Sequence, residues 1–522
     1  MIKKSKVSHV RILVLNPRGH NSIAKTLKEG IRMDAKKKTR MYRAGILGLG
    51  VLVMAAGALA VFTTGDDGGP QIRSSFREAP LNPEFVRYLY ERIPGRPWGG
   101  YTKDGYALGL IPSPLDPAIF EPQAGPEQIE NLPASYDLRT KNKLTSVKDQ
   151  ANCGSCWSFA TFGSLESFLK PAAIWDFSEQ DLIEKSGFDL GECDGGQILM
   201  SAAYLARWTG PGAESSHPYE YYSPNGIALK KHVQNIIMLP DKKSALDNAK
   251  IKDAVYKYGA VAVAMCWYDA SYKSTTYSYY YNGSANSGGH AVCVVGWDDN
   301  YSKTKFAKTP GGNGAFIVKN SWGTGWGKAG YFYVSYYDRF FGKRGGTALV
   351  KGEATNNYKA NYGYDDLGWV TNLGGNKPTC WMANIFKASA TGSLKAVSFY
   401  SVAASTAYEI YIYTNATSGK PTSGTKYATA KKGTITGMGY YTIPLGFYVP
   451  ITNGKNFSIV VKLTTKGYNY PVPIEEKLSG YSSKAKALSG QSYVSMDGKA
   501  WSELKSINAD WTNNCLRAFT KY

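Results

Sequence analysis

The sequence predicts an α+β fold, in which a domain that mixes helices and strands is followed by an all-β sandwich. From Cys156 onward, apolar residues recur at three- and four-residue spacing and stop before Pro171, as in an amphipathic helix. Short apolar runs typical of buried strands surround His290 and Asn320. After about residue 355, short β-branched and aromatic segments alternate with Gly, Pro, Ser and Asn clusters, which predicts a sandwich.

A cysteine stands at the start of the predicted helix, in Gln150-Ala-Asn-Cys-Gly-Ser-Cys-Trp157. Cys156 lies on the first turn, where unpaired backbone N–H groups and the helix dipole stabilise a thiolate, the reactive form of cysteine. Two cysteines three apart also suit a zinc site or a redox dithiol. The remaining cysteines lack the paired spacing that zinc needs; they are residues 193, 266, 293, 380 and 515. We therefore interpret Cys156 as a nucleophile that needs a base.

The base is predicted in Ser287-Gly-Gly-His-Ala-Val-Cys-Val-Val-Gly-Trp297, where a small-residue turn precedes an apolar strand carrying His290. His217, in His-Pro-Tyr, and His232, in a polar segment, are expected to be solvated or packing histidines. Downstream, Phe316-Ile-Val-Lys-Asn-Ser-Trp-Gly-Thr-Gly-Trp326 presents Asn320 on a short strand. A side-chain amide can hold one imidazole nitrogen while the other faces the thiol, which is the arrangement of nucleophile, base and orienting residue.

Together these motifs resemble the papain (C1) family of cysteine peptidases. The local signature C-G-[SA]-C-[WY] is met by residues 153–157, and His290 lies at the usual distance downstream. Asn320 lies slightly farther than usual, which fits an insertion over Asp298–Gly314. Further matches are Leu132-Pro-Ala-Ser-Tyr-Asp-Leu-Arg139, Phe177-Ser-Glu-Gln180 and Cys193-Asp-Gly-Gly196. The resemblance implies a two-lobed peptidase, with a helical lobe and a β-barrel-like lobe, over residues 131–352.

Residue roles are implied by the same resemblance. Cys156 would be the nucleophile, His290 the general base and acid, and Asn320 the residue that orients His290. Gln150 would donate a hydrogen bond from its amide to the oxyanion, which would lower the barrier by about 3 kcal/mol. The cleft would be formed by further residues: Gly195 and Gly196 binding the substrate backbone, Trp322 covering the His290 contact, and Gln197, Ile198, Ala264, Gly289 and Ala291 lining the pocket for the side chain second from the cleaved bond. Neither a metal nor an organic cofactor is required.

Cysteine usage indicates a thin disulfide framework that is compatible with export. The resemblance supports a bridge between Cys153 and Cys193, whereas Lys185 stands where the family usually has another cysteine. Cys380 and Cys515 could staple the ends of the C-terminal region. Two others, at 266 and 293, lie in apolar strand-like segments and read as buried thiols.

The N-terminal residues 1–65 read as a basic leader with a targeting segment. Ala44–Phe62 carries no charge and follows Lys36-Lys-Lys-Thr-Arg40, so it is either a cleaved signal peptide or a retained membrane anchor, and the remainder is extracellular or at the cell surface. Residues 1–60 hold 13 Lys and Arg against 2 acids, so they supply +11 of the net charge of +21. The remaining +10 forms no long basic run, which argues against a nucleic-acid partner.

Residues 66–130 are rich in Pro and Gly and include Leu110-Ile-Pro-Ser-Pro-Leu-Asp116, which cannot continue a helix. They lack the long helical motif of many papain-type propeptides. Two interpretations stay open for this stretch: an inhibitory pro-region or an arm that packs the domains.

The C-terminal segment, residues 358–522, is predicted to hold strands over Val397–Ser401, Tyr408–Tyr413, Tyr440–Ile443 and Phe457–Leu463, with a hairpin turn at Asp497-Gly498. Its aromatic motifs resemble the lectin-like domain that follows C1 peptidases in some archaeal and bacterial surface proteins: Tyr362-Gly-Tyr-Asp-Asp-Leu-Gly-Trp369, Tyr468-Asn-Tyr-Pro471 and Gly480-Tyr-Ser-Ser483. These rings could stack on cell-surface sugars or fill the sandwich core.

The sequence thus predicts an exported cysteine endopeptidase that acts on proteins or peptides, with a C-terminal domain that can target glycans. One alternative is a surface adhesion or wall-binding protein with a vestigial peptidase domain, although a retired site has no need of Gln150, Cys156, His290 and Asn320 together. A transpeptidase would use the same triad and would be distinguished by its products with added amines.

Overall fold

The structure is a computed structural model that describes residues 76–121, 131–220, 226–284, 288–343 and 345–521. They belong to one compact unit, Ser74–Tyr522. The predicted signal or anchor run at 44–62 lies outside the described residues. Within the described ranges, no helix is long and apolar enough to cross a membrane.

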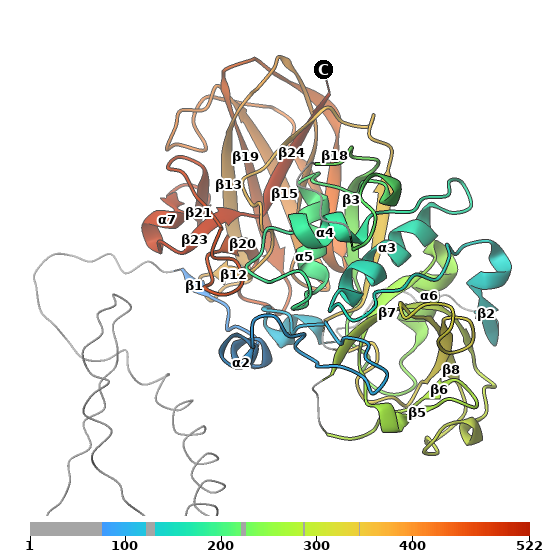
Figure 1. Cartoon of the computed structure of the whole chain (residues 1–522). Coiled ribbons are helices and arrows are strands. Elements are labelled where there is room, and N and C mark those ends of the chain that lie inside the picture. The colour runs from blue at the N-terminus through green and yellow to red at the C-terminus, as the bar shows by residue number, and fades with distance from the viewer. Residues whose placement is uncertain (1–75, 122–130, 221–225, 285–287, 344, 522) are drawn as a thin grey trace, which may run out of the picture. The chain divides into compact units, whose positions relative to one another are not determined.

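Helices cluster in the first domain, as the α+β prediction requires (Figure 1). α3 begins at the predicted cysteine and ends before Pro171, and it packs against strands β4, β7 and β10. α4 is capped by Ser178, whose hydroxyl accepts the Asp181 N–H at 3.0 Å. The helices are α2 (Pro83–Glu91), α3 (Cys156–Leu169), α4 (Glu179–Lys185), α5 (Ile198–Ala206), α6 (Ala249–Tyr258) and α7 (Leu504–Ile507). Short 3-10 turns are η1 (Pro117–Phe120), η2 (Leu138–Lys141), η3 (Glu214–Ser216), η4 (Asp269–Ser271) and η5 (Lys303–Lys305).

Strands of the first domain form a sheet with the antiparallel order β3-β10-β4-β7-β8-β9, which is extended by β6, parallel to β9, and then by β5, with β2 paired to β7. The strands at the two ends of this order do not pair with each other, so the described strands form an open sheet and no closed barrel. The predicted insertion is the loop between β7 and β8, and it carries η5. The bounds are β2 (Ser135–Asp137), β3 (His232–Met238), β4 (Val261–Cys266), β5 (Tyr272–Lys273), β6 (Ser278–Tyr279), β7 (Gly289–Asp298), β8 (Ala315–Lys319), β9 (Tyr331–Ser335) and β10 (Ala348–Glu353).

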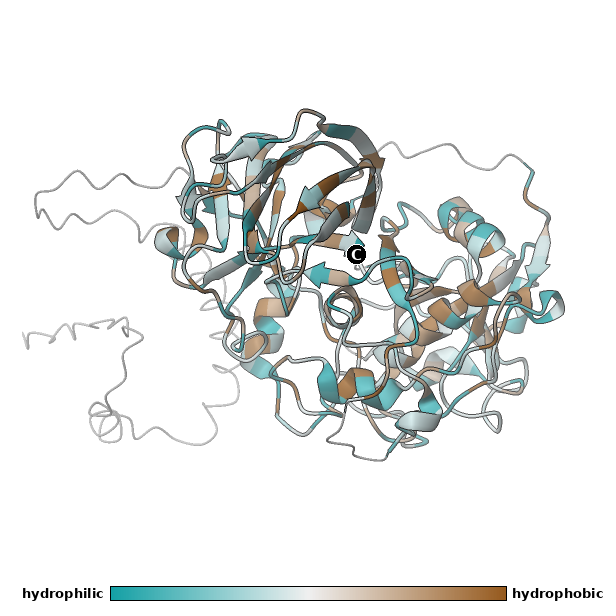
Figure 2. Ribbon diagram, turned by 90° about the horizontal axis from the view of Figure 1, so that it is seen from above, coloured by the Kyte–Doolittle hydropathy of each residue, from teal (hydrophilic) through white to brown (hydrophobic). Residues whose placement is uncertain are grey.

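The C-terminal domain is the predicted all-β sandwich, and the four strands read from the sequence lie within β14, β15, β18 and β19. One sheet has the order β16-β15-β19-β13-β21-β22, and its partner contains β11-β24-β14-β18. Figure 2 shows hydrophobic stretches on strands of this domain. The bounds are β11 (Ala360–Tyr362), β13 (Thr379–Lys387), β14 (Gly392–Ser401), β15 (Ser405–Thr414), β16 (Thr425–Lys426), β17 (Lys431–Thr436), β18 (Met438–Ile451), β19 (Asn456–Thr465), β21 (Ser492–Ser495), β22 (Ser502–Glu503) and β24 (Leu516–Lys521).

A third, four-stranded sheet attaches the N-terminal segment to the C-terminal domain. Its order is β1-β12-β20-β23, and β1 pairs antiparallel with β12 through Arg77 opposite Gly374. The segment that continues from β1, residues 76–121, is called the arm below. The bounds are β1 (Arg77–Glu78), β12 (Thr371–Gly374), β20 (Val472–Glu476) and β23 (Trp511–Asn514).

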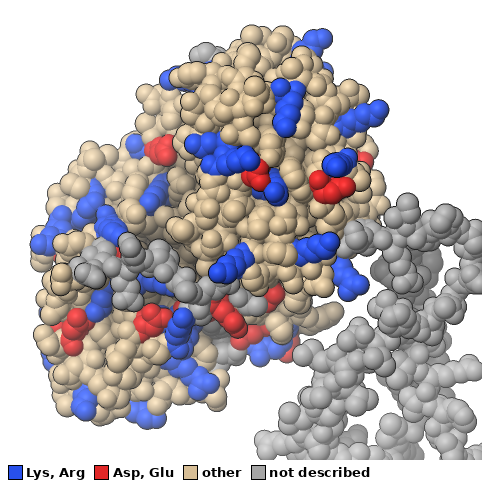
Figure 3. All heavy atoms as spheres, turned by 180° about the vertical axis from the view of Figure 1, so that it is seen from behind, with Lys and Arg blue, Asp and Glu red and all other residues tan. Residues whose placement is uncertain are grey.

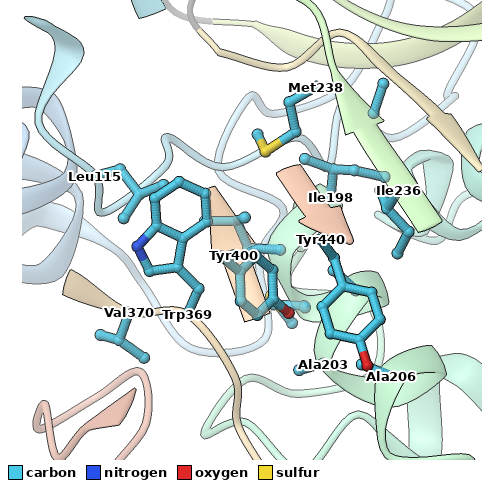
Figure 4. Close-up of a cluster of buried hydrophobic side chains, with 14 of the residues drawn as sticks. Leu115, Ile198, Ala203, Ala206, Ile236, Met238, Trp369, Val370, Tyr400 and Tyr440 are labelled. Carbon is cyan, nitrogen blue, oxygen red and sulfur yellow. The ribbon is translucent and has the colours of Figure 1, made fainter. Parts of the chain in front are cut away.

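One sheet runs through both domains, because β18 of the C-terminal domain pairs with β3 of the first domain. Gly439 lies opposite Ile237 in that pairing, and a Cβ on it would lie 2.0 Å from the Ile236 carbonyl oxygen. The close backbone approach therefore requires glycine at this position. A shared hydrophobic core lies beside the junction, where Trp369, Tyr400 and Tyr440 pack with residues of β3 and α5 (Figure 4).

The aromatic motifs of the C-terminal domain mostly fill this core. Trp369, Tyr468 and Tyr481 are buried, with exposed fractions of 1%, 9% and 0%. The sugar-stacking interpretation is therefore wrong for these three rings, since no face of them is open to a ligand. Two other tyrosines of these motifs, Tyr362 and Tyr364, are half-buried against the core of the C-terminal sandwich.

A disulfide joins Cys153 to Cys193, as the resemblance implied. The suggested bridge between Cys380 and Cys515 is wrong, because both are free buried thiols. Cys380 lies within β13 in the sandwich core and donates to the Ser495 carbonyl, whereas Cys515 packs in the core shared by the two domains. The two thiols thus belong to different hydrophobic clusters.

Candidate active site

The predicted nucleophile, Cys156, is the first residue of α3 and is fully buried. The Ala291 N–H donates to its Sγ at 3.4 Å. Burial raises the pKa of the thiol to about 11, although backbone N–H groups of Ala291 and Gly109 oppose that shift. The thiolate expected at a helix N-terminus is therefore not favoured in this state, because desolvation outweighs the backbone donors.

The predicted base, His290, lies on β7 opposite Met265 of β4. Its Nε2 lies 2.8 Å from the Asn320 Oδ1, and the Ser321 N–H donates to that same oxygen. Since the amide oxygen accepts, Nε2 carries the hydrogen and Nδ1 is left as the basic nitrogen. Among the described residues, Nδ1 has no hydrogen-bond partner. Burial lowers the pKa of His290 to about 4, against the opposing effect of the Asn320 hydrogen bond.

Trp322 covers the imidazole. Its ring stacks on His290 with a centroid distance of 4.7 Å and is fully buried. The Trp322 ring also stacks with Tyr106 of the arm, at a centroid distance of 4.9 Å, and meets Trp267 edge-on at 4.8 Å. The tryptophan therefore excludes water from the contact between His290 and Asn320.

Gln150 is held with its amide donors directed at backbone carbonyls beside the thiol. Its Nε2 donates to the Cys153 carbonyl at 2.8 Å and to the Ala107 carbonyl of the arm at 3.0 Å. Its Oε1 accepts the Ser321 hydroxyl at 2.7 Å, which fixes which end of the amide is the donor. The side chain is fully buried, so its position is set by these three hydrogen bonds.

The arm runs through the cleft above these residues and pairs with both of its walls. On one side the Leu110 N–H donates to the Gly289 carbonyl at 3.0 Å. On the other side the Gly196 N–H donates to the Gly109 carbonyl at 2.9 Å, and the Ile111 N–H donates to the Gly196 carbonyl at 3.1 Å. The predicted backbone-binding glycine thus holds the arm's backbone as a strand would be held.

Glycines permit this close approach. Gly195 has φ +126, and a Cβ on it would lie 2.4 Å from the Gly109 carbonyl oxygen. A Cβ on Gly109 would lie only 1.8 Å from the Gly154 carbonyl oxygen, beside the cysteine-bearing turn. Any side chain at Gly109 therefore forces the arm away from the thiol.

A cavity next to the cleft brings the predicted pocket residues together. All five line it, namely Gln197, Ile198, Ala264, Gly289 and Ala291. Its other lining residues were missed by sequence reasoning; they are Trp98, Leu110–Ser113, Trp157, Ala160, Thr161, Ala262, Val263, Met265, Gly345 and Gly346. Trp157 and Met265 are next to predicted site residues in the sequence, and this adjacency could have indicated them. The arm residues have no predicted site residue beside them in the sequence.

The other two histidines among the described residues are packing residues, as expected. His217 is buried with its Nδ1 3.4 Å from an Asp181 oxygen. His232 stacks on Trp208 at 3.6 Å and bonds to Asn357. Neither approaches Cys156 in the described structure.

A cysteine on the first turn of a central helix, facing a strand that carries a histidine bound to an asparagine amide, defines the class of cysteine peptidases. Residues 132–344 match the family model described as papain family cysteine protease, and residues 361–520 match the model described as lectin like domain. The chain belongs to the papain family of cysteine proteases and carries a C-terminal lectin-like domain.

Two similar proteins, a digestive cysteine proteinase and a viral cathepsin, match the peptidase domain. Digestive cysteine proteinase 1 of Homarus americanus is 34% identical over 248 residues, covering 44% of this chain and 68% of that protein. The viral cathepsin of Choristoneura fumiferana defective polyhedrosis virus is 35% identical over 215 residues, covering 39% of this chain. The chain spans 59% of the length of that cathepsin.

Solved structures match both domains together. The cysteine protease and lectin-like domains of Cwp84, a surface layer associated protein of Clostridium difficile, give a TM-score of 0.69 at 24% identity, covering 86% of this chain and 99% of that one. A variant of clostridial Cwp84 after propeptide cleavage gives 0.64 at 26% identity, covering 74% of this chain and 99% of that one. The two-domain fold is therefore shared.

Proposed function

We propose that this chain is a cysteine endopeptidase that hydrolyses peptide bonds in protein substrates. Residues 131–352 are its peptidase domain and residues 358–522 its lectin-like domain. The observation that carries the proposal is the hydrogen bond from His290 Nε2 to the Asn320 Oδ1, which leaves Nδ1 available as a base on the strand whose next residue, Ala291, contacts Cys156. Most buried polar atoms are hydrogen-bonded, so a buried ring nitrogen without a partner among the described residues points to a functional role.

In the mechanism, His290 takes the proton of the Cys156 thiol through Nδ1. The thiolate attacks the peptide carbonyl and forms a tetrahedral oxyanion, to which Gln150 Nε2 and the Cys156 backbone N–H donate. His290 then gives its proton to the leaving amine, and the thioester remains. Water attacks the thioester with His290 again as the base, which frees the carboxylic acid product and restores the thiol.

The arm is an inhibitory pro-region in this proposal. Its residues 107–111 occupy the place where a substrate backbone would pair with Gly196 and Gly289, and its Ala107 carbonyl takes the Gln150 donor. The arm also packs the domains, through β1 on β12, so the two interpretations of this stretch are compatible. Removal of the arm would open the cleft, and the similar clostridial Cwp84 structure is that of the protein after propeptide cleavage.

The lectin-like domain binds cell-surface carbohydrate, and the protein acts outside the cell or at its surface. The likeness to Cwp84, a surface layer associated protein, supports this placement. Figure 3 shows Lys and Arg scattered among acids over the face drawn, with no continuous basic patch there that would suit nucleic acid. Binding of full-length Cys156→Ala protein to purified cell-wall polysaccharide, against soluble competitor sugars, tests this part.

The decisive experiment compares wild type with Cys156→Ala after the arm has been cleaved from folded protein. An unfolded protein substrate should be hydrolysed by wild type and by Cys380→Ala, a matched thiol control in the lectin-like core, and not by Cys156→Ala. A cysteine-directed epoxide should label residue 156 alone. Absence of both cleavage and labelling between mildly acidic and neutral pH would refute the proposal, and amine-captured products would indicate transpeptidation.

A further inference from the structure

The lectin-like domain touches the loop that forms one wall of the substrate cleft. That loop, residues 187–197, carries the disulfide cysteine Cys193 and the backbone-binding glycines. The Asp189 N–H donates to the Tyr481 carbonyl at 2.9 Å. Ser483 returns two hydrogen bonds to the Asp189 carboxylate, from its N–H at 3.0 Å and from its hydroxyl at 2.8 Å. One end of the loop is therefore anchored on the other domain.

The other end of the loop is anchored through a pocket residue. Gln197 Nε2 donates to the Tyr481 hydroxyl at 2.6 Å, and both side chains are buried, with exposed fractions of 3% and 0%. Gln197 Oε1 accepts the Leu199 N–H at 2.7 Å, as the cap of α5. Both ends of this amide are thus fixed, and the same side chain lines the cavity proposed to receive the substrate side chain.

Aromatic packing fixes the tyrosine itself. Its ring meets Phe188 of the loop at 4.8 Å and Phe85 of the arm edge-on at 4.9 Å. Cleavage of the arm removes the Phe85 contact but leaves Phe188 and the hydrogen bonds to Asp189 and Gln197. These remaining contacts involve no arm residue, so we expect them to persist in the activated enzyme.

We propose that Tyr481 is a positioning residue for the peptidase: through Gln197 and the 187–197 loop, it sets the pocket for the substrate side chain second from the cleaved bond. The lectin-like domain is then a part of the substrate cleft, besides any role in attachment. This inference rests on the proposed peptidase function. Its chemical basis is that Gln197 is the one amide among the described residues that line the cavity, which are mainly apolar, so its orientation decides which side chains fit.

The test uses the full chain with the arm cleaved after folding, and compares wild type, Tyr481→Phe and Tyr448→Phe. Tyr481→Phe keeps the ring and removes the hydroxyl that Gln197 needs. Tyr448 is a matched control, since it belongs to the same domain and is 63% exposed. Peptides with Leu, Phe or Gly at the second position before the cleaved bond are the probes.

For Tyr481→Phe we expect KM for the Leu and Phe peptides to rise about three- to tenfold, with kcat within about twofold and little change for the Gly peptide. Tyr448→Phe should match wild type on every peptide. Gln197→Ala combined with Tyr481→Phe should be no worse than Gln197→Ala alone, because the two act through one hydrogen bond. Unchanged KM ratios in Tyr481→Phe, or a uniform loss of kcat with the same substrate ranking, would overturn the inference.

Amide hydrogen exchange in residues 187–197 separates this inference from the peptidase proposal. If wild type fails to cleave any peptide, the proposed function fails first. The positioning claim is still tested, because Tyr481→Phe should speed exchange in this loop while exchange in α3 stays unchanged. Identical exchange in the loop of both proteins would reject the claim without reference to activity.

Discussion

His290 Nε2 donates to the Asn320 Oδ1 at 2.8 Å, while the imidazole Nδ1 has no hydrogen-bond partner within the described residues. The amide fixes both the tautomer and the ring plane, and Trp322 shields the contact from water. Asn320 is placed to affect the reaction through its hydrogen bond to His290, so its removal should act through the orientation of His290 alone.

We expect Asn320→Ala to lower kcat by about 10²-fold and to leave KM within about threefold, since the base loses its fixed tautomer. Steady-state kinetics with the arm removed would measure both. Asn453→Ala, at an exposed asparagine of the lectin-like domain, is the control and should behave as wild type. A kcat within twofold of wild type for Asn320→Ala would contradict the assigned role.

Gln150 offers a test in which the shape of the side chain is kept. Its Oε1 accepts from Ser321 and its Nε2 is the donor, so Gln150→Glu keeps the acceptor and loses the donor. We expect kcat to fall by about 10²–10³-fold in Gln150→Ala and further in Gln150→Glu, where a carboxylate faces the oxyanion. Equal rates for Gln150→Glu and wild type would show that no oxyanion donor acts at this position.

Gly109 is the point at which the arm can be loosened without touching the peptidase. A Cβ there would meet the Gly154 carbonyl oxygen at 1.8 Å, so Gly109→Ala should displace the arm. We expect the uncleaved variant to show at least about tenfold higher basal peptidase activity than uncleaved wild type, which corresponds to about 1.4 kcal/mol of weaker docking. Gly226→Ala is the matched control, because a Cβ there meets nothing within 4 Å.

The reactivity of Cys156 should report arm docking. In the uncleaved chain, burial raises the pKa of the thiol to about 11 and lowers the pKa of His290 to about 4, so at pH 7 both groups are neutral. Alkylation by iodoacetamide should then be slow at pH 7 and rise with pH toward about 11, as the thiolate forms. After cleavage of the arm, water reaches the pair and labelling near pH 6 should become at least about 10²-fold faster. Mass spectrometry of the labelled peptide measures both rates, and equal rates before and after cleavage would contradict this account.

Local pattern predicted the parts of the site that are local in sequence. The start of α3 at Cys156, the strand of His290 and the strand of Asn320 follow from apolar periodicity and small-residue turns. The course of the arm could not be predicted, because a segment rich in Pro and Gly has no periodicity and its partners, such as Gly196, are distant in sequence.

Non-local pairing explains the errors as well. Counting cysteines suggested a bridge between Cys380 and Cys515, yet a count carries no information about which face of a strand each thiol occupies, and the two face different cores. Pairing of β18 with β3 joins residues about two hundred positions apart, which no local motif encodes. For the same reason the sequence leaves open whether Tyr481 stacks on sugars or fills a core, and the structure buries it in the core shared by the two domains.

Two carboxyl groups meet where the arm joins the lectin-like domain, and they should make the stability of this sheet depend on pH. Glu476 of β20 is 5% exposed, and Glu78 of β1 accepts the Trp511 indole N–H at 3.1 Å. Burial, then the charge and hydrogen bond of Glu78 and the charge of Asp510, raise the pKa of Glu476 well above its usual range. The folded protein therefore holds a proton that the unfolded chain releases near its ordinary pKa of 4.5, so the free energy of unfolding falls as pH rises above about 4.5.

Glu476→Gln removes this titration while keeping the shape of the side chain. We expect the variant to raise the free energy of unfolding by about 1–3 kcal/mol at pH 8, because wild type must take up a proton on folding at that pH and the variant need not, and by little at pH 4.5. Thermal unfolding of the uncleaved chain at pH 4.5, 6 and 8 measures the difference. Glu503→Gln, at a half-buried carboxylate of the same domain, is the control. Its difference from wild type in the free energy of unfolding should not shrink between pH 8 and pH 4.5. Curves for wild type and Glu476→Gln that stay parallel across this range would show that Glu476 titrates near its ordinary pKa.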